Sequence, residues 1–447
     1  MTTHRDRVLA ASAEAFRTPA PQMDEAMLRD FVARFLGHRD TYLSLAARHG
    51  TPLYLFDPAA LRARAAEFAR AFAAVLPSTR VYYAVKSNNH PAVAREVAHQ
   101  GLGLDVSSGV ELAMAIECGA TDIVFSGPGK TDAELTLAVE HADRVTVLMD
   151  SFAELHRLEH TAGGRGRSVR AGIRITNDER GLWRKFGIPL DQLPRLYDEA
   201  LGCSYVQLRG LQFHSSWNLD PTAQVAFIER LGQALAALPA GKRRWVEFID
   251  IGGGFWPPSG EWLQRAGTPV GRIEAAALGD GGGLRGRYCL PAQPIETFAE
   301  ALSSALGEHV FPHIEPTICL EPGRWLSHEA MHLLLSVVDC KSADLAITDG
   351  GTNAIGWERF EVDYFPVINL SRPALVAREC MVLGSLCTPH DVWGDEFFGE
   401  MIGPGDVLLI PTQGAYTYSL RQEFIKPIPK VVSVETGEAV GDAAGRP

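Results

Sequence analysis

The sequence feature that most constrains the fold is a regular alternation of short aliphatic runs with amphipathic segments between residues 81 and 320. The aliphatic runs cover residues 81–85, 102–106, 122–125, 145–149, 169–175, 208–213, 246–251 and 317–320. Segments with helical periodicity separate them, among others at residues 91–100, 109–118, 132–141 and 224–238. Strands that alternate with helices in this way are parallel and are joined by helical crossovers. Eight such strands in succession predict a (β/α)8 barrel.

The chain outside this region has a different pattern. Beyond about residue 330, residues 331–339, 345–348, 375–383 and 407–410 resemble strands, while Gly, Pro and Asn mark turns and helical periods are absent. This pattern predicts a mostly antiparallel β-domain. Residues 1–50 predict two helical stretches with a breaker at residues 18–22.

The predicted boundaries follow from these patterns. Residues 1–57 form an N-terminal segment that packs with the β-domain, residues 58–330 form the barrel, and residues 331–447 form the β-domain. Residues 256–294 fit neither domain, and a segment of this length is usually functional or disordered. Its glycine run at 279–283 resembles a phosphate loop only superficially, because no strand leads directly into it.

Composition excludes several classes of protein. The net charge of −12 gives no electrostatic reason to expect nucleic acid as a partner. No apolar stretch approaches the roughly 18–20 residues that span a bilayer, and the N-terminus has no apolar signal core. The seven cysteines form no CxxC pair and no zinc-like spacing with histidine. We therefore expect a cytoplasmic protein with reduced thiols, no metal and no membrane contact.

Polar residues gather where the predicted strands end. They are Lys86, Asp105, Arg174, His214, the triplet Gly252, Gly253 and Gly254, and the pair Glu321 and Arg324. In a (β/α)8 barrel the active site lies at the carboxyl ends of the strands. A chance distribution of structural residues would not favour that one rim, so the positions themselves predict a converging site.

Lys86 and the glycine triplet point to one kind of cofactor. A lysine at the mouth of a barrel loses hydration, which lowers its pKa and favours the neutral amine that forms a Schiff base. The glycines allow backbone N–H groups to approach an anion. Pyridoxal phosphate needs such a lysine, such a cradle and a partner for its ring nitrogen, for which Glu321 is suited. Each residue also has a simpler interpretation, such as a lysine extending to the rim or a local ion pair between Glu321 and Arg324.

The motifs as a set resemble the fold-type III pyridoxal-phosphate decarboxylases, which include the diaminopimelate, ornithine and biosynthetic arginine decarboxylases. The resemblance runs from about Thr51 to Pro427. It is carried by residues 83–88 (YAVKSN), 105–108 (DVSS), 127–130 (GPGK), 185–187 (KFG), 213–214 (FH), 250–254 (DIGGG), 321–324 (EPGR), 349–351 (DGG), 372–375 (RPAL), Cys387 and 414–416 (GAY). So many matches in the right order are highly specific.

The resemblance implies roles for individual residues. Lys86 would hold the cofactor, His214 would stack on its ring, and Cys387 of the partner subunit would donate a proton after carbon dioxide leaves. The expected cofactor-binding set is completed by Asp105, Arg174, Gly253, Gly254, Glu321, Gly323, Arg324 and Tyr416, and the expected substrate-binding residues are Asp349, Arg372, Thr388 and Tyr416. A head-to-tail homodimer with shared sites would follow. Asp391 matches a family aspartate that pairs across this interface with the lysine at the position of Lys185.

The sequence departs from the family pattern near the substrate. Thr388 follows the cysteine where the diaminopimelate and ornithine enzymes carry an acid that binds the distal ammonium, and Val376 replaces a substrate-contacting tyrosine. Residues 349–372 are longer than in the diaminopimelate enzyme. In that loop Arg359 is expected to meet a carboxylate, and Trp357 or Tyr364 to pack an acyl group. Residues 215–217 (SSW) also differ from the family pattern, so the sequence does not identify which serine, if any, binds the phosphate.

These departures predict decarboxylation of an amino acid, or of an amino-acid conjugate, that has no free distal amine, as in a branch of the family that serves siderophore and antibiotic pathways. Diaminopimelate decarboxylation remains an alternative, with Glu358, Glu361 or Asp363 replacing the missing acid. An amino-acid racemase is a second alternative, which Glu321 disfavours because racemases of this barrel place arginine at the ring nitrogen. A non-catalytic cofactor-binding protein is a third, and the retention of Lys86 and Cys387 disfavours it.

Overall fold

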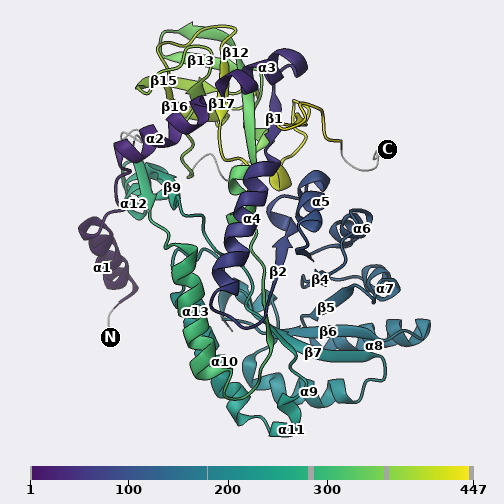
Figure 1. The fold of residues 1–447 in the computed structure, drawn as a ribbon. Coiled ribbons are helices and arrows are strands. Elements are labelled where there is room, and N and C mark those ends of the chain that lie inside the picture. Colours follow the sequence, from purple (N-terminus) through teal and green to yellow (C-terminus); the bar gives the residue numbers. More distant parts are fainter. Residues whose placement is uncertain (1–2, 179, 280–285, 357–361, 442–447) are drawn as a thin grey trace. The chain divides into compact units, whose positions relative to one another are not determined.

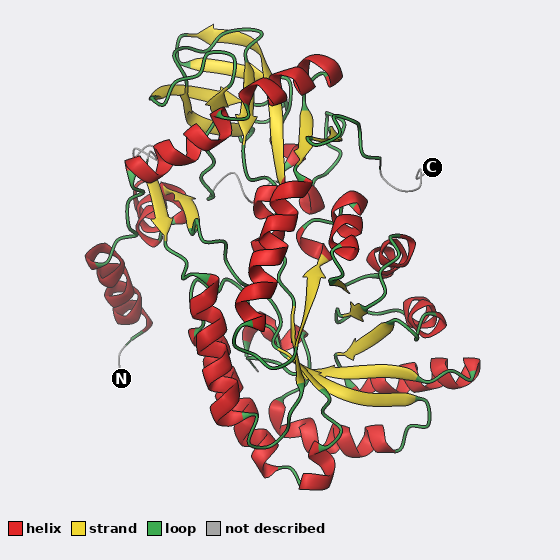
Figure 2. Cartoon of the chain, in the orientation of Figure 1, coloured by secondary structure: helices red, strands yellow, loops and turns green. Residues whose placement is uncertain are grey.

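The computed structural model describes residues 3–178, 180–279, 286–356 and 362–441. The chain divides into two compact units. The barrel unit contains Ala60–Pro258 and Gln293–Ser327, and the β-rich unit contains Met1–Ala59, Ser259–Ala292 and His328–Gly441. Figure 2 shows the strands of both units in yellow.

The barrel unit is a closed ring of eight parallel strands (Figure 1). Around the ring they are β11 (Thr317–Leu320), β2 (Thr79–Ala84), β3 (Gly103–Val106), β4 (Ile123–Phe125), β5 (Val145–Met149), β6 (Val169–Arg174), β7 (Val206–Gln212) and β8 (Phe248–Asp250). Each strand coincides with one of the eight aliphatic runs, and the predicted (β/α)8 barrel is confirmed.

Helices follow the strands and cover the outside of the ring. They are α4 (Pro58–Ala73), α5 (Pro91–His99), α6 (Gly109–Glu117), α7 (Asp132–Glu140), α8 (Phe152–Arg165), α9 (Leu193–Leu201), α10 (Thr222–Ala237), α11 (Ala240–Arg243), α13 (Ile295–His309) and α14 (Arg324–Ser327), with short 3-10 turns at Val85–Ser87, Gly181–Lys185 and Leu190–Gln192. Side chains cap several of the helices that begin beside the active rim. Ser108 accepts from the backbone of Glu111, and Thr131 forms a capping box with Glu134. Each cap satisfies an N–H group that has no partner inside its helix.

The β-rich unit contains an eight-stranded sheet that is mostly antiparallel, as predicted. Its strands, in spatial order, are β13 (Leu345–Thr348), β15 (Ala377–Leu383), β16 (Val392–Phe398), β14 (Ile368–Asn369), β17 (Val407–Ile410), β12 (Met331–Ser342), β1 (Leu53–Phe56) and β18 (Lys430–Ser433). Strand β1 pairs antiparallel with β12 and parallel with β18, so the segment before the barrel is built into this sheet.

The N-terminal segment forms three helices instead of the predicted two. They are α1 (His4–Arg17), α2 (Glu25–Leu36) and α3 (Arg39–His49). Gly37 and His38 separate α2 from α3 within what reads as one amphipathic stretch. Leu28, Val32 and Phe35 of α2 pack in the same buried cluster as the sheet residues Leu334 and Leu409.

Part of the segment counted with the barrel packs elsewhere. Ser259–Ala292 belongs to the β-rich unit, where it forms the hairpin β9 (Glu261–Gln264) and β10 (Arg287–Leu290), the turn Arg265–Gly267 and helix α12 (Pro269–Leu278). Trp262 and Cys289 pack against the core of that unit, and Arg287 lies 3.6 Å from the Glu396 carboxylate. The segment Ser259–Ala292 packs with the β-rich unit because of these long-range contacts, which no local sequence pattern reveals. Most of the glycine run lies outside the described residues.

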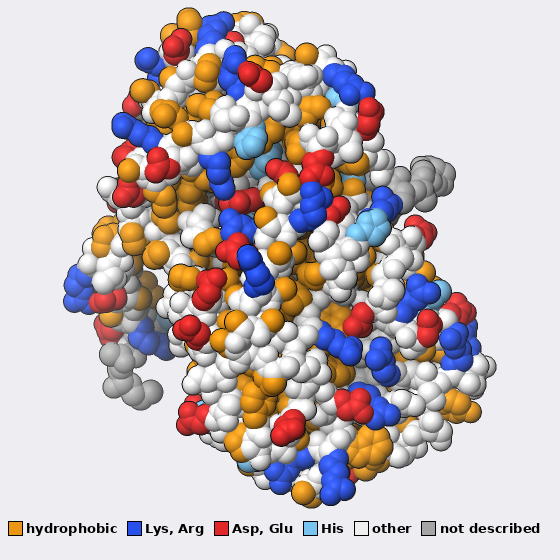
Figure 3. All heavy atoms as spheres, viewed as in Figure 1, with side chains coloured by type: hydrophobic (Ala, Val, Ile, Leu, Met, Phe, Trp, Pro, Cys, Tyr) orange, Lys and Arg blue, Asp and Glu red, His pale blue; other side chains and the backbone are white. Residues whose placement is uncertain are grey.

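The surface carries no sign of a single dominant charge on the face drawn in Figure 3, where acidic and basic side chains are interspersed. Within the described residues, no helix combines the length and the apolar character that a membrane crossing requires.

Candidate active site

The barrel brings five of the predicted site residues together at one end of the ring. Lys86 follows β2, Asp105 lies on β3, Arg174 ends β6, His214 follows β7 and Glu321 follows β11. Side chains of a strand alternate between its two faces, and these residues lie on the face directed into the barrel. They interact with one another in the folded chain.

Lys86 is held by an ion pair. Its Nζ lies 2.6 Å from Oδ2 of the buried Asp105, whose Oδ1 accepts from the Ser126 hydroxyl at 2.6 Å. Burial raises the pKa of the Asp105 carboxyl, and the charge of Glu321 acts in the same direction, while Lys86 opposes both. The lysine is thus paired with a carboxylate, whereas the sequence analysis expected only a loss of hydration at the barrel mouth.

Glu321 is a buried carboxylate with room for one more donor. Oε1 accepts from Nε2 of Gln212 at 3.3 Å, and Oε2 lies 3.7 Å from Nδ1 of His214. Burial alone would raise the pKa of Glu321, but the contact with His214 and the positive charges of Lys86 and Arg174 outweigh it and lower that pKa to about 2. An ionised carboxylate in this position is suited to a heterocyclic N–H.

His214 and Asp250 complete the polar interior. Burial lowers the pKa of His214, while the Glu321 carboxylate opposes that shift, and Nδ1 accepts from the backbone N–H of Gly253 at 3.1 Å. That bond places the ring proton on Nε2. Burial also raises the pKa of Asp250 well above its ordinary value, and the charge of Glu321 adds to the shift. The pKa values of these two neighbouring acids are therefore shifted in opposite directions, upward for Asp250 and downward for Glu321.

The glycine triplet forms a cradle that a side chain would fill. A Cβ on Gly253 would lie 2.1 Å from the Glu321 carbonyl oxygen, and one on Gly254 would lie 2.2 Å from that of Ser215. Gly254 also has a φ of +83°, which L side chains rarely adopt. Ser215 accepts from the Asn218 amide at 3.0 Å, and the Arg324 guanidinium lies 4.3 Å from the centre of the Trp256 ring. Lys86, the ionised Glu321 and this cradle fit the aldehyde, ring nitrogen and phosphate of pyridoxal phosphate.

Arg174 is positioned by an aromatic ring. Its guanidinium lies 4.4 Å from the centre of Phe186 and, among the described residues, has no hydrogen-bond partner. The loop that carries Phe186 returns to β6, because Ile188 donates to the carbonyl of Arg174 at 3.0 Å.

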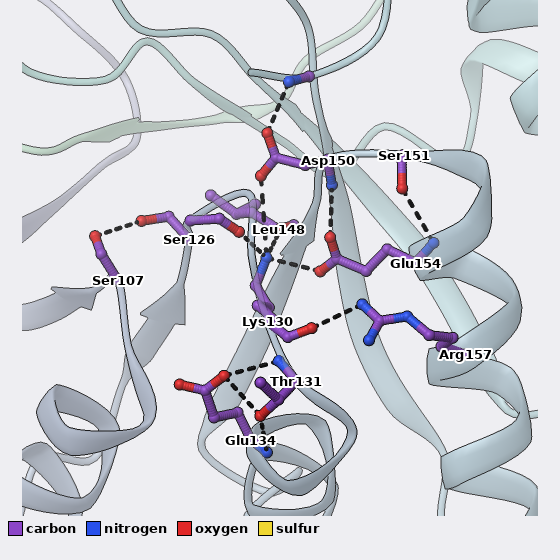
Figure 4. A network of polar contacts seen from close by, with 12 residues as sticks. Ser107, Ser126, Lys130, Thr131, Glu134, Leu148, Asp150, Ser151, Glu154 and Arg157 are labelled. Carbon is purple, nitrogen blue, oxygen red and sulfur yellow. Dashed lines mark hydrogen bonds and ion pairs between the residues drawn. The ribbon is translucent and has the colours of Figure 1, made fainter. Parts of the chain in front are cut away.

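A buried lysine, Lys130, lies next to the aspartate that holds the same loop (Figure 4). Lys130 Nζ donates to the carbonyls of Gly127 and Leu148, each at 2.7 Å, and pairs with Glu154 at 2.7 Å. Asp150, 4.0 Å from this ammonium, accepts from the backbone N–H of Gly187 at 2.7 Å. Two carbonyls and two carboxylates surround this ammonium, so the cluster supports the rim structurally. The sequence showed Lys130 only as part of a motif.

In the β-rich unit, the exposed Cys387 lies on the loop between β15 and β16. Asp391 organises this loop from within. Its Oδ2 accepts from the backbone N–H of Leu386 at 2.6 Å, and its Oδ1 accepts from the N–H and hydroxyl of Thr352 at 2.7 and 3.0 Å. The carboxylate is buried and fully engaged within its own chain. It is therefore not exposed for the expected pairing with Lys185 of a second subunit.

The remaining predicted substrate residues all lie in the β-rich unit. Both carboxylate oxygens of Asp349 are engaged, by the Thr51 hydroxyl at 2.5 Å and the Ser336 N–H at 2.9 Å, which differs from the expected role as a substrate ligand. Arg372 lies 3.3 Å from Asp406. Thr388 is half-buried, and its hydroxyl accepts from His390 at 3.4 Å.

The rest of that unit's candidate residues are placed as follows. Tyr416 has a φ of +56°, a strained conformation that is common at functional sites. Tyr364 is buried and donates to Glu396 at 2.7 Å. It therefore packs in the core, whereas the sequence analysis expected it to contact an acyl group of the substrate. Trp357, Glu358, Arg359 and Glu361 lie outside the described residues.

Sequence reasoning gave no role to two residues that shape the site, and it did not reveal the contacts of Asp391 within its own chain. Gln212 and Asp250 both contact Glu321 from neighbouring strands. The sequence contained a signal for both. Gln212 lies two residues before His214, and Asp250 lies two residues before Gly252, so each shares the inward face of its strand with a predicted rim residue. The bonds of Asp391 join segments far apart in the sequence, so no local signal could reveal them.

Comparison with known proteins agrees with this geometry. Residues 60–261 match the family described as pyridoxal-dependent decarboxylase, pyridoxal binding domain. The chain is 29% identical over 428 residues to diaminopimelate decarboxylase of Bacillus subtilis, covering 89% of each chain. It is 25% identical over 400 residues to the L-glutamyl-[BtrI acyl-carrier protein] decarboxylase of Niallia circulans, covering 84% of this chain and 86% of that one.

A solved structure gives the same result for the fold. The crystal structure of diaminopimelate decarboxylase from M. jannaschii in co-complex with L-lysine aligns with a TM-score of 0.72 and 25% identity, covering 88% of this chain and 89% of that one. Barrel, site and relatives agree on a pyridoxal-phosphate-dependent decarboxylase with the fold of the fold-type III enzymes, in which residues 60–261 are the pyridoxal-binding domain.

Proposed function

We propose that this decarboxylase acts on an amino acid whose distal amine is absent, acylated or otherwise masked, including one presented as a conjugate. The observation that carries the proposal is Thr388, which follows Cys387 where the diaminopimelate and ornithine enzymes have an acid. A hydroxyl cannot balance an ammonium, and an unpaired buried charge costs several kcal/mol.

The surroundings of Thr388 support the same conclusion. Two carboxylates lie in the loops that meet there, Asp349 and Asp391. Asp349 is engaged by Thr51 and Ser336, and Asp391 by Leu386 and Thr352. Recruiting either one to a substrate ammonium would leave buried N–H groups without partners, at about 1–3 kcal/mol each. The relative that decarboxylates a glutamyl carrier-protein conjugate is a precedent for a masked substrate.

Diaminopimelate decarboxylation is the second candidate, because the relative of 29% identity has that activity. It requires another acid to replace the one that Thr388 lacks. Glu358 and Glu361 of the long loop have the right chemistry but lie outside the described residues. Asp363 is within them, and its backbone is tied to Gln264 of β9.

The barrel residues divide the chemistry among them. Pyridoxal phosphate, when bound, supplies an electron sink for the bond to the carboxyl group. Lys86 would hold its aldehyde carbon, and the Glu321 carboxylate would keep a proton on its ring nitrogen. His214 would cover the ring face and exclude water, while Gly253, Gly254, Gly323 and Arg324 would hold the phosphate. The Cys387 thiol would deliver the proton that replaces carbon dioxide.

We further propose a homodimer in which Cys387 and Tyr416 of one subunit complete the site of the other. The exposure of the Cys387 thiol supports this assignment, since a donor that serves another chain must be accessible. All seven cysteines are free, which supports work in a reducing compartment such as the cytoplasm.

The proposed substrate class is tested by carbon dioxide release from the cofactor-loaded enzyme. Diaminopimelate, lysine and ornithine are compared with glutamate and a glutamyl pantetheine thioester, which have no distal amine, and only substrates of the second group should be turned over efficiently. A kcat/KM above about 10⁴ M⁻¹s⁻¹, the lower end of the ordinary range, for any of the three free diamino acids would refute the proposal.

A substitution sharpens this test. Thr388→Glu should raise kcat/KM for ornithine or diaminopimelate at least about tenfold, since it offers an ammonium the missing partner. Thr436→Glu, at an exposed position of the same unit, adds the same charge elsewhere and should change nothing. Equal effects of the two variants would mean that Thr388 does not face the distal end of the substrate.

A further inference from the structure

The end of the barrel opposite the rim contains a separate cavity of about 130 Å³. Its lining comes from seven strands of the ring and consists of Arg80, Tyr82, Val124, Thr146, Arg170, Arg209, Glu247, Phe248, Thr317 and Cys319. All of these residues belong to the barrel unit. Three of them are arginines, whereas bulky branched residues usually fill the interior of such barrels.

Strand β6 shows how this cavity relates to the active site. Arg170 and Arg174 lie four residues apart on one strand and therefore share the inward face. Arg174 belongs to the rim, where its charge lowers the pKa of Glu321, and Arg170 lines the lower cavity. The two guanidinium groups therefore lie at opposite ends of the same barrel.

An apolar layer separates the two ends. Tyr82, Val124, Leu148 and Cys319 are buried together with Phe248 packed against them. The backbone of Gly210 lies against this layer so closely that a Cβ there would be 2.4 Å from the Phe248 ring. The lining of the lower cavity accordingly contains neither Lys86 nor Glu321.

The charges in the lower cavity do not balance. Arg80 pairs with Asp122 at 3.2 Å, and Arg209 pairs with Glu247 at 2.5 Å. Of the three guanidinium groups, only that of Arg170 has neither a hydrogen bond nor an ion pair with any part of the chain that the structure describes. Thr146 is its neighbour in the register of β5 and β6, and the Thr146 hydroxyl also lines the cavity. Three guanidinium groups against two carboxylates leave one positive charge, located at Arg170.

We propose that this cavity binds a small oxyanion, such as phosphate or a short carboxylate, with Arg170 as its main ligand. A guanidinium group offers paired donors that match an oxyanion, and such charge-assisted bonds are strong. The volume is well below the roughly 300–1,000 Å³ of pockets for organic ligands, but it has room for several water molecules. It therefore suits an ion of phosphate size and excludes a nucleotide or a second pyridoxal phosphate.

The test uses inorganic phosphate with the cofactor-loaded enzyme, in which the cofactor's own phosphate occupies the upper cradle. A ligand that binds only the folded state raises the unfolding temperature in a saturable way. Phosphate should do so, and chloride at the same ionic strength should not, since general screening acts equally for both. Sulfate and malonate distinguish a tetrahedral from a carboxylate preference.

Variants locate the binding. Arg170→Gln should weaken the apparent phosphate affinity about tenfold to a hundredfold, the equivalent of one lost charge-assisted bond, and should leave turnover unchanged. Arg195→Gln, an exposed arginine on α9, is the matched control and should behave as wild type. Thr146→Val keeps the side-chain shape and should weaken phosphate binding less than Arg170→Gln does. This second variant tests the proposal if Arg170→Gln does not fold. Unsaturable stabilisation, or equal phosphate affinity in Arg170→Gln or Thr146→Val and the wild type, would overturn the proposal.

Discussion

The carboxylate of Asp391 accepts a hydrogen bond from the backbone N–H of Leu386 at 2.6 Å, immediately before Cys387 in the sequence. Its other oxygen holds Thr352 on the neighbouring loop. One buried side chain therefore fixes the backbone from which the proposed proton donor projects, and its partners lie in its own subunit.

We expect Asp391→Asn to lower turnover while leaving the cofactor bound. The amide presents a nitrogen to one of the two N–H groups, and an unsatisfied buried donor costs about 1–3 kcal/mol. The loop should then sample other conformations, with kcat reduced about tenfold or more and the reaction rate of the Cys387 thiol altered. The visible absorbance of the cofactor should not change, because Lys86 lies in the other unit. Glu400→Gln, at an exposed position, is the control, and unchanged kcat and thiol reactivity in Asp391→Asn would contradict the assignment.

Much of the fold could be predicted because its pattern is local. The aliphatic runs of β5 and β11 coincide with the observed strands, and Ser151 caps the helix that follows β5. Strands β1, β14, β16 and β18 were not predicted. The four residues of β1 form a strand because the distant β12 and β18 pair with it on its two sides. Sequence position likewise placed Lys86, His214 and Glu321 on one rim. It could not show that Asp105 pairs with the lysine or that Asp349 is engaged by Thr51, since those contacts depend on packing between distant segments.

Glu321→Gln should reduce turnover by about two orders of magnitude or more, with cofactor still bound. His214, Lys86 and Arg174 lower the pKa of this carboxyl to about 2, so the carboxylate is ionised. An amide of the same shape carries no charge to keep a proton on the ring nitrogen, and each 1.4 kcal/mol lost from the transition state is roughly tenfold in rate. Steady-state kinetics and cofactor absorbance measure the two effects separately. Glu229→Gln on the exposed face of α10 should match wild type, and near-normal turnover in Glu321→Gln would mean that the ring nitrogen needs no acidic partner.

Mixing two inactive variants tests the shared dimer site. Lys86→Ala and Cys387→Ala should each be inactive, and Lys86→Ala should also lose the visible absorbance of the cofactor. If each site takes Lys86 from one subunit and Cys387 from the other, random exchange gives about one intact site in four. Activity near a quarter of wild type is therefore expected in the equimolar mixture. Demonstrated exchange with no recovered activity would place both residues in the site of a single chain.

The last prediction concerns acid stability and a histidine outside the active site. His332 of β12 is buried, its ring lies edge-on to Phe35 at 5.0 Å, and its Nδ1 accepts from the backbone N–H of Thr412 at 3.1 Å. Burial lowers the pKa of His332 to about 4. Between this value and the ordinary value of about 6.5 the unfolded chain binds a proton that the folded chain does not, so the stability falls as the pH drops through that window. At about 1.4 kcal/mol per unit, the loss from this residue reaches roughly 3 kcal/mol near pH 4.

Replacement by a residue that does not titrate should remove this pH dependence. His332→Asn keeps an acceptor for Thr412 but leaves a cavity, so it should lower the free energy of unfolding of the β-rich unit at pH 7 by a few kcal/mol. Towards about pH 4.5 the deficit relative to wild type should shrink, because only the wild type must protonate its unfolded histidine. Urea unfolding at both pH values measures the difference, with the exposed His99→Asn as the matched control. A deficit that stays constant with pH would show that His332 does not contribute to the acid sensitivity of the fold.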